Sequence, residues 1–263
     1  NDVYVDPSLT HPIDYQGKYY SSKGVLQMTG RFHGERPLLF QAGISVQSRK
    51  FGSKYADCLF TSQPNIDKDR AFYKEVKGYA EGYGRNPNHL LVLPGLYAVV
   101  AESDEAARKL KADIDELMDL NFLIRQLSGQ IGIPFEELDP NKPLPVELFD
   151  KIPTEDEVIQ YRRNDIGGVA VANGFTVKQL VHHNLTRGQR TIFGTPEQIA
   201  DIIEDWIDTD VADGFNVNSH VQPYGVEKFK DVIAELQNRG RFRRDYEHMT
   251  FRENYGLPSN PLY

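Results

Sequence analysis

Short apolar runs alternate with amphipathic segments along most of the chain, and this alternation predicts the fold class. Within the runs, apolar and polar residues do not alternate, which is typical of strands buried on both faces of a parallel sheet. The segments between the runs carry apolar residues at helical spacing. Four strands are predicted in this way, at residues 38–42, 57–61, 90–93 and 211–216. The order of elements indicates an α/β fold with a parallel sheet covered by helices.

The predicted helices have recognisable first residues. Ser45, Ser103 and Thr195 stand where an N-cap is expected, and Pro196 occupies the first helical position after Thr195. Helices are predicted at residues 45–55, 67–83, 176–185 and 226–236, and from residues 103 and 195 onward. In the helix that begins after Ser103, the spacing predicts one buried stripe: Leu110, Ile114, Leu117 and Met118.

Two stretches depart from this alternation. Residues 1–35 are polar and rich in Tyr, Gly and Ser, which predicts a loop arm with at most a short hairpin. Residues 129–168 are acidic and contain five prolines, which predicts an irregular insertion over one end of the main domain. We therefore expect a main domain at residues 36–263 that carries the insertion.

Composition and charge restrict the kinds of binding partner and the cellular compartment that we expect. The chain has 263 residues and a formal net charge of −8, which argues against nucleic acid as the main partner because phosphate binding needs a basic face. Cys58 is the single cysteine, so an intrachain disulfide is impossible and a reducing, cytoplasmic location is expected. The longest apolar run, residues 89–101, is broken by Pro94 and Gly95 and is too short to cross a membrane. We expect no membrane partner.

Five motifs occur in an order that resembles a known family. They are Gln41-Ala42-Gly43-Ile44-Ser45, Ala56-Asp57-Cys58-Leu59-Phe60, Leu93-Pro94-Gly95, Gly194-Thr195-Pro196-Glu197-Gln198-Ile199-Ala200-Asp201 and Ala212-Asp213-Gly214-Phe215-Asn216. In this combination the sequence resembles the bacterial luciferase-like flavin monooxygenases, in the branch of nitrilotriacetate monooxygenase component A. The resemblance implies a (β/α)8 TIM-barrel type of fold. Because a closed barrel has eight strands, this chain is expected to supply about the C-terminal half, strands five to eight.

The resemblance also implies a reaction and its partners. Members of the family use FMN in the reduced form, supplied by a separate flavin reductase, together with O2 and a small organic substrate. A half-barrel exposes an apolar face, so we expect either a complementary N-terminal barrel half or self-association into a homo-oligomer. An alternative of another class is a non-catalytic half-barrel that serves as a structural or subunit-interaction module. A deazaflavin-dependent oxidoreductase on the same barrel is a third reading, which the branch-specific motifs disfavour.

The candidate site lies where the first predicted strand meets a helix. Gly43 allows a close backbone approach, and the N–H groups of a helix start favour phosphate. The resemblance implies that Ser45 helps to hold the FMN phosphate, with Gln41, Gly43 and Asn216 as further cofactor-binding residues. From the residues alone, Ser45 is better explained as an N-cap and Asn216 as a strand-end cap. His220 follows the last predicted strand and is a candidate catalytic residue. No metal motif is present, and none is expected.

The predicted half-barrel has an inner face that must be covered in a complete barrel. We expect Phe40, Leu59, Leu91 and Phe215 to line this face.

Overall fold

The computed structural model describes residues 6–24, 36–43, 45–63, 65–185 and 189–259. Ile44 of the first motif lies outside these residues. The chain divides into two units, Asn1–Pro37 with Thr250–Tyr263, and Leu38–Met249. The first unit contains η1 (Pro7–Leu9), an antiparallel hairpin of β1 (Ile13–Gln16) and β2 (Ser21–Gly24), and α10 (Phe251–Asn254). No helix in the described ranges is long and apolar enough to cross a membrane.

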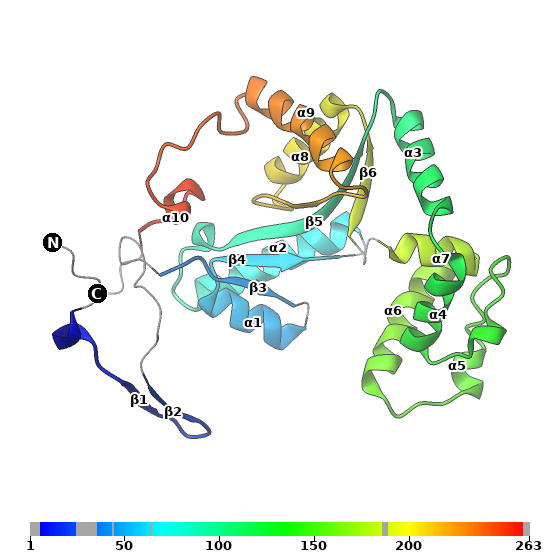
Figure 1. The fold of residues 1–263 in the computed structure, drawn as a ribbon, viewed down its shortest axis with the longest axis horizontal. Coiled ribbons are helices and arrows are strands. Elements are labelled where there is room, and N and C mark those ends of the chain that lie inside the picture. The colour runs from blue at the N-terminus through cyan, green and yellow to red at the C-terminus, as the bar shows by residue number, and fades with distance from the viewer. Residues whose placement is uncertain (1–5, 25–35, 44, 64, 186–188, 260–263) are drawn as a thin grey trace. The chain divides into compact units, whose positions relative to one another are not determined.

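The second unit is an α/β structure, as predicted (Figure 1). Its sheet contains β3 (Phe40–Ala42), β4 (Cys58–Thr61), β5 (Leu91–Val100), β6 (Arg190–Gly194) and β7 (Asn216–Asn218). Its helices are α1 (Val46–Tyr55), α2 (Ile66–Gly82), α3 (Asp104–Glu116), α4 (Leu120–Ile131), α5 (Leu148–Lys151), α6 (Glu157–Asn173), α7 (Val177–Asn184), α8 (Pro196–Asp208) and α9 (Tyr224–Asn238), with 3-10 turns η3 (Pro87–His89) and η4 (Phe135–Glu137).

Every strand pairing in this sheet is parallel, which confirms the predicted topology. β3, β4 and β5 pair in sequence order. β5 is long enough to pair with β4 along residues 91–94 and with both β6 and β7 farther along. Two strand predictions were wrong. β6 was missed, and the strand predicted at residues 211–216 begins only at Asn216 because Val211 and Ala212 donate their N–H groups to the Trp206 carbonyl instead of to a strand.

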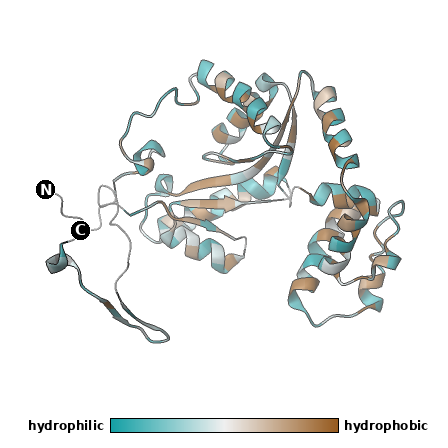
Figure 2. Ribbon diagram, in the orientation of Figure 1, coloured by the Kyte–Doolittle hydropathy of each residue, from teal (hydrophilic) through white to brown (hydrophobic). Residues whose placement is uncertain are grey.

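The two faces of the sheet have different surroundings. The register places Gln41, Leu59 and Val92 in one row, and Leu59 and Val92 pack in a buried cluster with residues of α2. In Figure 2, much of β4 and β5 is brown, which marks hydrophobic residues. Alternate residues point to the opposite face. Phe40 on that face is 53% exposed, and Phe60, Leu91 and Leu93 are half-buried. Cys58 pairs with both Phe40 and Leu91, so it lies on the same face, and it is fully buried. We call this face, defined by Phe40, Ala42, Cys58, Phe60, Leu91 and Leu93, the open face.

Of the four residues predicted to line the inner face of the half-barrel, two do not lie on the open face. Phe40 and Leu91 lie on it, as expected. Leu59 lies on the opposite face and is 1% exposed beneath the helices, because it is one position out of phase with Phe60 along the strand. Phe215 precedes β7 and packs against the ring of Trp206, at 5.5 Å between centroids.

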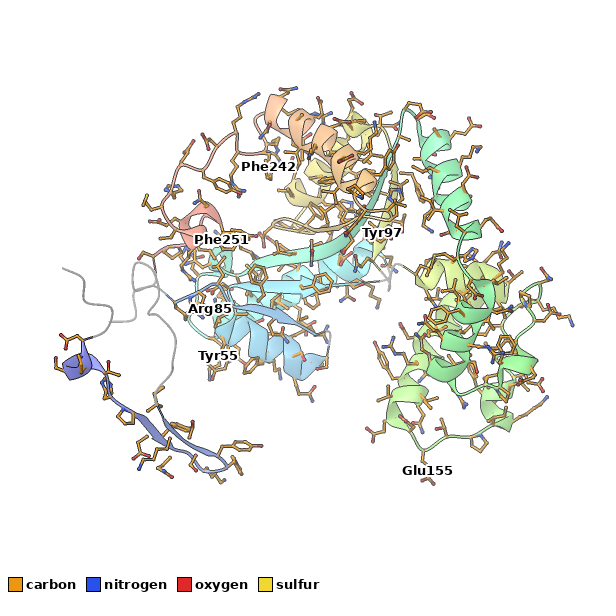
Figure 3. The ribbon with its side chains drawn as sticks, in the orientation of Figure 1. Tyr55, Arg85, Tyr97, Glu155, Phe242 and Phe251 are labelled. Atoms are coloured by element: carbon orange, nitrogen blue, oxygen red, sulfur yellow. The ribbon has the colours of Figure 1, made fainter. Side chains whose placement is uncertain are left out.

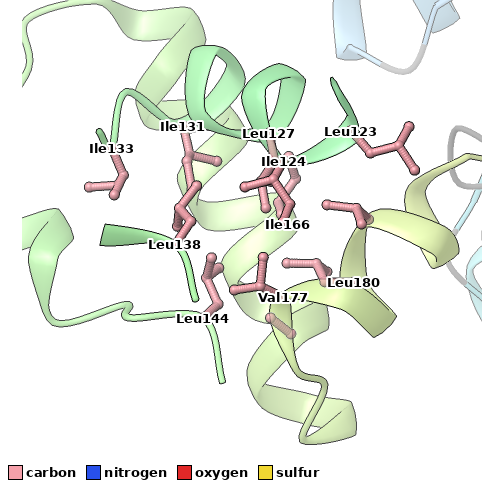
Figure 4. Close-up of a cluster of buried hydrophobic side chains, with 12 residues drawn as sticks. Leu123, Ile124, Leu127, Ile131, Ile133, Leu138, Leu144, Ile166, Val177 and Leu180 are labelled. Carbon is pink, nitrogen blue, oxygen red and sulfur yellow. The ribbon is translucent and has the colours of Figure 1, made fainter. Parts of the chain in front are cut away.

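The segment between β5 and β6 is largely helical, and α6 begins within the stretch predicted to be irregular. Between α4 and α6, residues 132–156 are mostly irregular, as predicted, and contain only η4 and α5. α4, α5, α6 and α7 form the helical insertion, which has its own buried core (Figure 4). The prolines of this region lie in the connections between α4 and α6, so they end helices without preventing them. The stripe predicted for α3 was also wrong in part: the helix ends at Glu116, and Leu117 is 85% exposed.

Arg163 organises the helical insertion from inside. The side chain is 6% exposed and lies over the ring of Phe149. Its guanidinium donates hydrogen bonds to the carbonyl oxygens of Ile131, Gly132, Phe149 and Ile152. These carbonyls belong to the ends of α4 and α5, where helix geometry leaves acceptors without partners. One buried cation therefore fastens two helix ends to α6.

Candidate functional site

In the turn between β3 and α1, the backbone at Gly43 passes close to the side chain of Ser48. Gly43 has φ of +149°, a conformation that glycine adopts much more readily than other residues. A Cβ at Gly43 would lie 2.7 Å from both Cβ and Oγ of Ser48. The Ser45 hydroxyl accepts the N–H of Ser48 at 3.2 Å and donates to the Ser48 Oγ at 3.1 Å. We call Gly43, Ser45 and Ser48 the serine cradle.

The serine cradle is suited to an anion. Ser45 is exposed and is the N-cap of α1, as predicted. The first N–H groups of any helix have no acceptor inside that helix and carry the positive end of its dipole. The first turn of α1 contains no acidic residue, whereas α2 begins with Asp67 and Asp69. Hydroxyl and N–H donors without a nearby carboxylate in that turn can bind a phosphate group.

Gln41 lies beside the cradle. Its amide nitrogen donates to the Ala42 carbonyl at 2.9 Å and would be 3.2 Å from a Cβ on Gly43. On its other side, Gly52 of α1 provides the space for the Gln41 amide oxygen, which would lie 2.8 Å from a Cβ there. The structure thus brings Gln41, Gly43 and Ser45 together at the carboxyl end of β3.

Asn216 is not part of this group. It is exposed, begins β7 and pairs with Gly95 of β5, and two strands, β4 and β5, separate β7 from β3 in the sheet. Its neighbour Asn218 donates to the Gln189 side chain at 2.6 Å. In a parallel sheet the carboxyl ends of all strands lie on the same side of the sheet, so β7 ends on the same side as β3.

His220 follows β7 and is half-buried. Its ring lies 6.4 Å from the ring of Tyr97, centroid to centroid (Figure 3 labels Tyr97). Burial lowers the pKa of the imidazole, and neither ring nitrogen has a hydrogen-bond partner among the described residues. A histidine with a lowered pKa is uncharged at neutral pH and can accept a proton.

The motif around Asp213 has a structural role that the sequence did not reveal. The Asp213 carboxylate accepts the Tyr73 hydroxyl at 3.0 Å and the Val92 N–H at 2.7 Å, and its Oδ2 lies 2.8 Å from Nζ of Lys77. Lys77 also donates to the carbonyls of Pro87 and Leu90. Burial raises the pKa of the Tyr73 hydroxyl, and the Asp213 carboxylate raises it further. This network attaches the segment before β7 to α2 and β5.

A second buried carboxyl lies in the first turn of α2. Asp69 of α2 is 1% exposed, and within the described ranges neither of its carboxyl oxygens has a hydrogen-bond partner. Burial raises its pKa to about 7, although the charge of Arg190 opposes the shift. The Arg190 guanidinium lies over the ring of Trp206, at 4.6 Å from its centroid. Asp69 is therefore partly protonated at neutral pH.

This carboxyl predicts a pH dependence of stability. Because folded Asp69 holds its proton more tightly than the unfolded chain does, the free energy of unfolding falls as pH rises from the ordinary value of 3.8 to about 7. Asp69→Asn removes that loss, so we expect the variant to gain up to about 4 kcal/mol over the parent at pH 8 and little at pH 4. Urea unfolding at both pH values measures the difference. Asp67→Asn, on the exposed side of the same turn, should show no such gain; an Asp69→Asn variant that is less stable at pH 8 would contradict the prediction.

Metal chemistry has no obvious ligand set in the described part of the chain. No group of three or more His, Cys, Asp or Glu side chains there is arranged to hold a metal ion.

Sequence comparisons identify relatives along nearly the whole chain. Nitrilotriacetate monooxygenase component A of Aminobacter aminovorans is 35% identical over 260 residues, which are 96% of this chain and 55% of the relative. N-acetyl-S-(2-succino)cysteine monooxygenase of Bacillus subtilis (strain 168) is 31% identical over 258 residues, or 97% of this chain and 57% of the relative. The chain thus spans a little over half the length of the curated relatives it matches.

A structural comparison agrees with the half-barrel topology. The crystal structure of riboflavin lyase with modified FMN and its substrate riboflavin superimposes with a TM-score of 0.73 at 25% identity, covering 98% of this chain and 55% of that one. The sequence profile described as luciferase-like monooxygenase matches residues 6–213. A match over most of the chain, together with a curled parallel sheet that covers half of its neighbours' barrels, shows that this chain belongs to the luciferase-like monooxygenase family.

Proposed function

We propose that this chain contributes the phosphate end of a flavin site to a two-component monooxygenase that acts on a small organic substrate with O2. The observation that carries the proposal is the serine cradle: a glycine with φ of +149°, two hydroxyl groups and an acid-free helix start meet at the carboxyl end of a parallel strand. The two relatives are named as monooxygenases, and one is named as component A. Component A implies a second component, which we propose to be a flavin reductase.

The residues present fit FMN. At Gly43 any side chain would collide with Ser48, and the hydroxyls of Ser45 and Ser48 can donate to phosphate oxygens. Gln41 holds the backbone of the turn through its bond to the Ala42 carbonyl. When bound, reduced flavin would supply the electrons for oxygen activation. The protein's own contribution is to anchor the phosphate, orient the cofactor and exclude water.

Exclusion of water requires the open face to be covered. Phe40, Phe60 and Leu93 present apolar side chains on that face, and in a closed barrel such side chains are packed. We propose that an N-terminal barrel half, corresponding to the part of the relatives that this chain does not match, covers it. The alternative, a non-catalytic interaction module, shares this contact but predicts that the completed barrel binds no flavin.

The test is FMN titration of the completed barrel, with this chain and an N-terminal half co-purified. Ser45→Glu places a carboxylate at the helix start, and we expect it to weaken FMN binding at least tenfold, which corresponds to about 1.4 kcal/mol. Thr176→Glu is the matched control, because Thr176 caps α7 in the same way and lies in the helical insertion. Equal affinities for parent and Ser45→Glu would refute the phosphate role, and no flavin binding by the parent would favour the non-catalytic module.

A further inference from the structure

The open face continues along β5 beyond its apolar residues. On the opposite face, Leu96 and Ala98 pack in a buried cluster with residues of α8 and α9. Gly95 and Tyr97 therefore lie on the side of the open face, because alternate residues of a strand point to opposite faces of the sheet. β4 pairs with β5 only as far as Pro94. Gly95 and Tyr97 thus lie past the carboxyl end of β4, at the end of the barrel where enzymes of this fold bind their substrates.

α3 limits this part of the open face on the far side. Val99, the next residue of the same row, is fully buried and pairs with Phe193 of β6. Arg108 of α3 lies over the Phe193 ring, at 4.5 Å from its centroid. Between α3 and the apolar residues of the open face there remains a short stretch of β5 and β7, in which Tyr97 and Asn218 are half-buried.

Two side-chain amides meet on this stretch. Asn218 of β7 pairs with Tyr97 of β5, so it lies on the same face. Its Nδ2 donates to Oε1 of Gln189 at 2.6 Å and to the Asn216 carbonyl at 3.3 Å. Gln189 occupies the space that a side chain at Gly95 would fill, because a Cβ there would lie 2.7 Å from the Gln189 Cγ. We call Gln189 and Asn218 the amide pair.

The contacts of the amide pair fix which atoms it offers to a ligand. A backbone carbonyl only accepts, so the Asn218 atom beside the Asn216 carbonyl is the nitrogen, and the Gln189 atom that faces this nitrogen is the oxygen. Gln189 Nε2 and Asn218 Oδ1 have no hydrogen-bond partner among the described residues, and neither is a buried atom. Adjacent side chains therefore present one donor group and one acceptor.

We propose that the amide pair binds an uncharged planar group with a carbonyl oxygen and an N–H on the same edge, as lactams, imides and pyrimidine-diones have. The carbonyl would accept from Gln189 Nε2, and the N–H would donate to Asn218 Oδ1. A carboxylate fits less well, because it has only acceptors to offer to Asn218 Oδ1. The proposal rests on the proposed function, since either the substrate or the ring edge of the flavin would present this group in the completed barrel.

The experiment uses the completed barrel, in which only this chain is isotope-labelled, and follows the side-chain NH2 signals of Gln189 and Asn218 by NMR. The probe is 2-pyrrolidone, a lactam, titrated with and without FMN. We expect it to shift both signals. N-methyl-2-pyrrolidone lacks the N–H and leaves the Asn218 acceptor unpaired, so we expect it to bind at least about fivefold more weakly.

The FMN titration distinguishes the two sources of the group. If FMN shifts both signals and then prevents the shift by 2-pyrrolidone, the amide pair binds the flavin edge. If the lactam still shifts both signals when FMN is bound, the pair binds the substrate. Failure of the barrel to bind FMN would contradict the proposed function alone, because the lactam titration without FMN would still decide whether the amide pair is a binding site.

Variants of this chain test the assignment of atoms. Gln189→Glu keeps the oxygen that accepts from Asn218 but loses the donor group, so we expect at least about fivefold weaker binding of the lactam. Gly95→Ala should weaken it by displacing Gln189. The matched controls are Gln126→Glu, exposed on α4, and Gly129→Ala, where an added Cβ meets nothing within 4 Å; both should bind as the parent does. Unshifted amide signals, parent-like binding by Gln189→Glu, or equal binding of the two lactams would each overturn the proposal.

Discussion

Asp213→Asn is expected to lower the free energy of unfolding by about 3 kcal/mol. The substitution leaves the Lys77 ammonium, which is 9% exposed, without its carboxylate, and it weakens the bonds to the Tyr73 hydroxyl and the Val92 N–H. Removing one partner of a buried ion pair is costly because the remaining charge stays desolvated. Urea unfolding followed by fluorescence of Trp206, the single tryptophan, measures the change.

Two further variants distinguish the loss of the Asp213 network from the general effect of removing any carboxylate on the free energy of unfolding. Asp113→Asn removes the partner of exposed Lys109 and should cost no more than about 1 kcal/mol. In a Lys77→Met background, Asp213→Asn should cost much less than in the parent, because the buried cation is gone. If both asparagine variants destabilise equally, Asp213 does not have the role described.

The second large effect concerns the open face. We expect this chain alone to self-associate, because Phe40 is 53% exposed and Phe60, Leu91 and Leu93 are only half-buried on the open face. Phe40→Lys should shift the chain toward the monomer in size-exclusion chromatography with light scattering. The physical reason is that association would bury the new charge.

Phe51→Lys is the matched control for that experiment. Phe51 is 59% exposed on α1, so the same chemical change is made at a similarly exposed ring that does not lie on the open face. Its association should match that of the parent. A monodisperse parent monomer of 30.0 kDa, or equal effects of the two lysines, would contradict a role for the open face.

The sequence predicted the strands that are buried on the helix-covered face. β3, β4 and β5 appear as apolar runs, and each is followed by a helix with a clear first residue. β6 could not be predicted from an apolar run. In Arg190–Gly194 only Ile192 and Gly194 are buried, so this segment lacks the continuous apolar character of a central strand. The opposite error occurred at Val211 and Ala212, which are buried around Trp206 without being a strand. An apolar run therefore predicts that residues are buried. It predicts a strand only where the run is also paired with neighbouring strands.

The residues of the candidate site also differ in how well the sequence predicts them. Gly43 and Ser45 could be predicted because strand, glycine, cap and helix follow one another within a few residues. The partners of Asp213, namely Tyr73 and Lys77, precede it by more than a hundred positions, so no local pattern relates them. The same applies to Asp69 and Arg190, whose charges act on each other across more than a hundred positions.

The length of β5 has a consequence for the order of folding. Its first half pairs with β4, which is close in sequence, whereas Leu96 pairs with Arg190 and Val217 only after the helical insertion has been traversed. Closing such a long loop is entropically costly and slows the formation of non-local pairs. The helical insertion has its own core and contacts that are local in sequence. Early structure should therefore consist of two independent nuclei, β3 to β5 and the helical insertion, with β6 and β7 joining last.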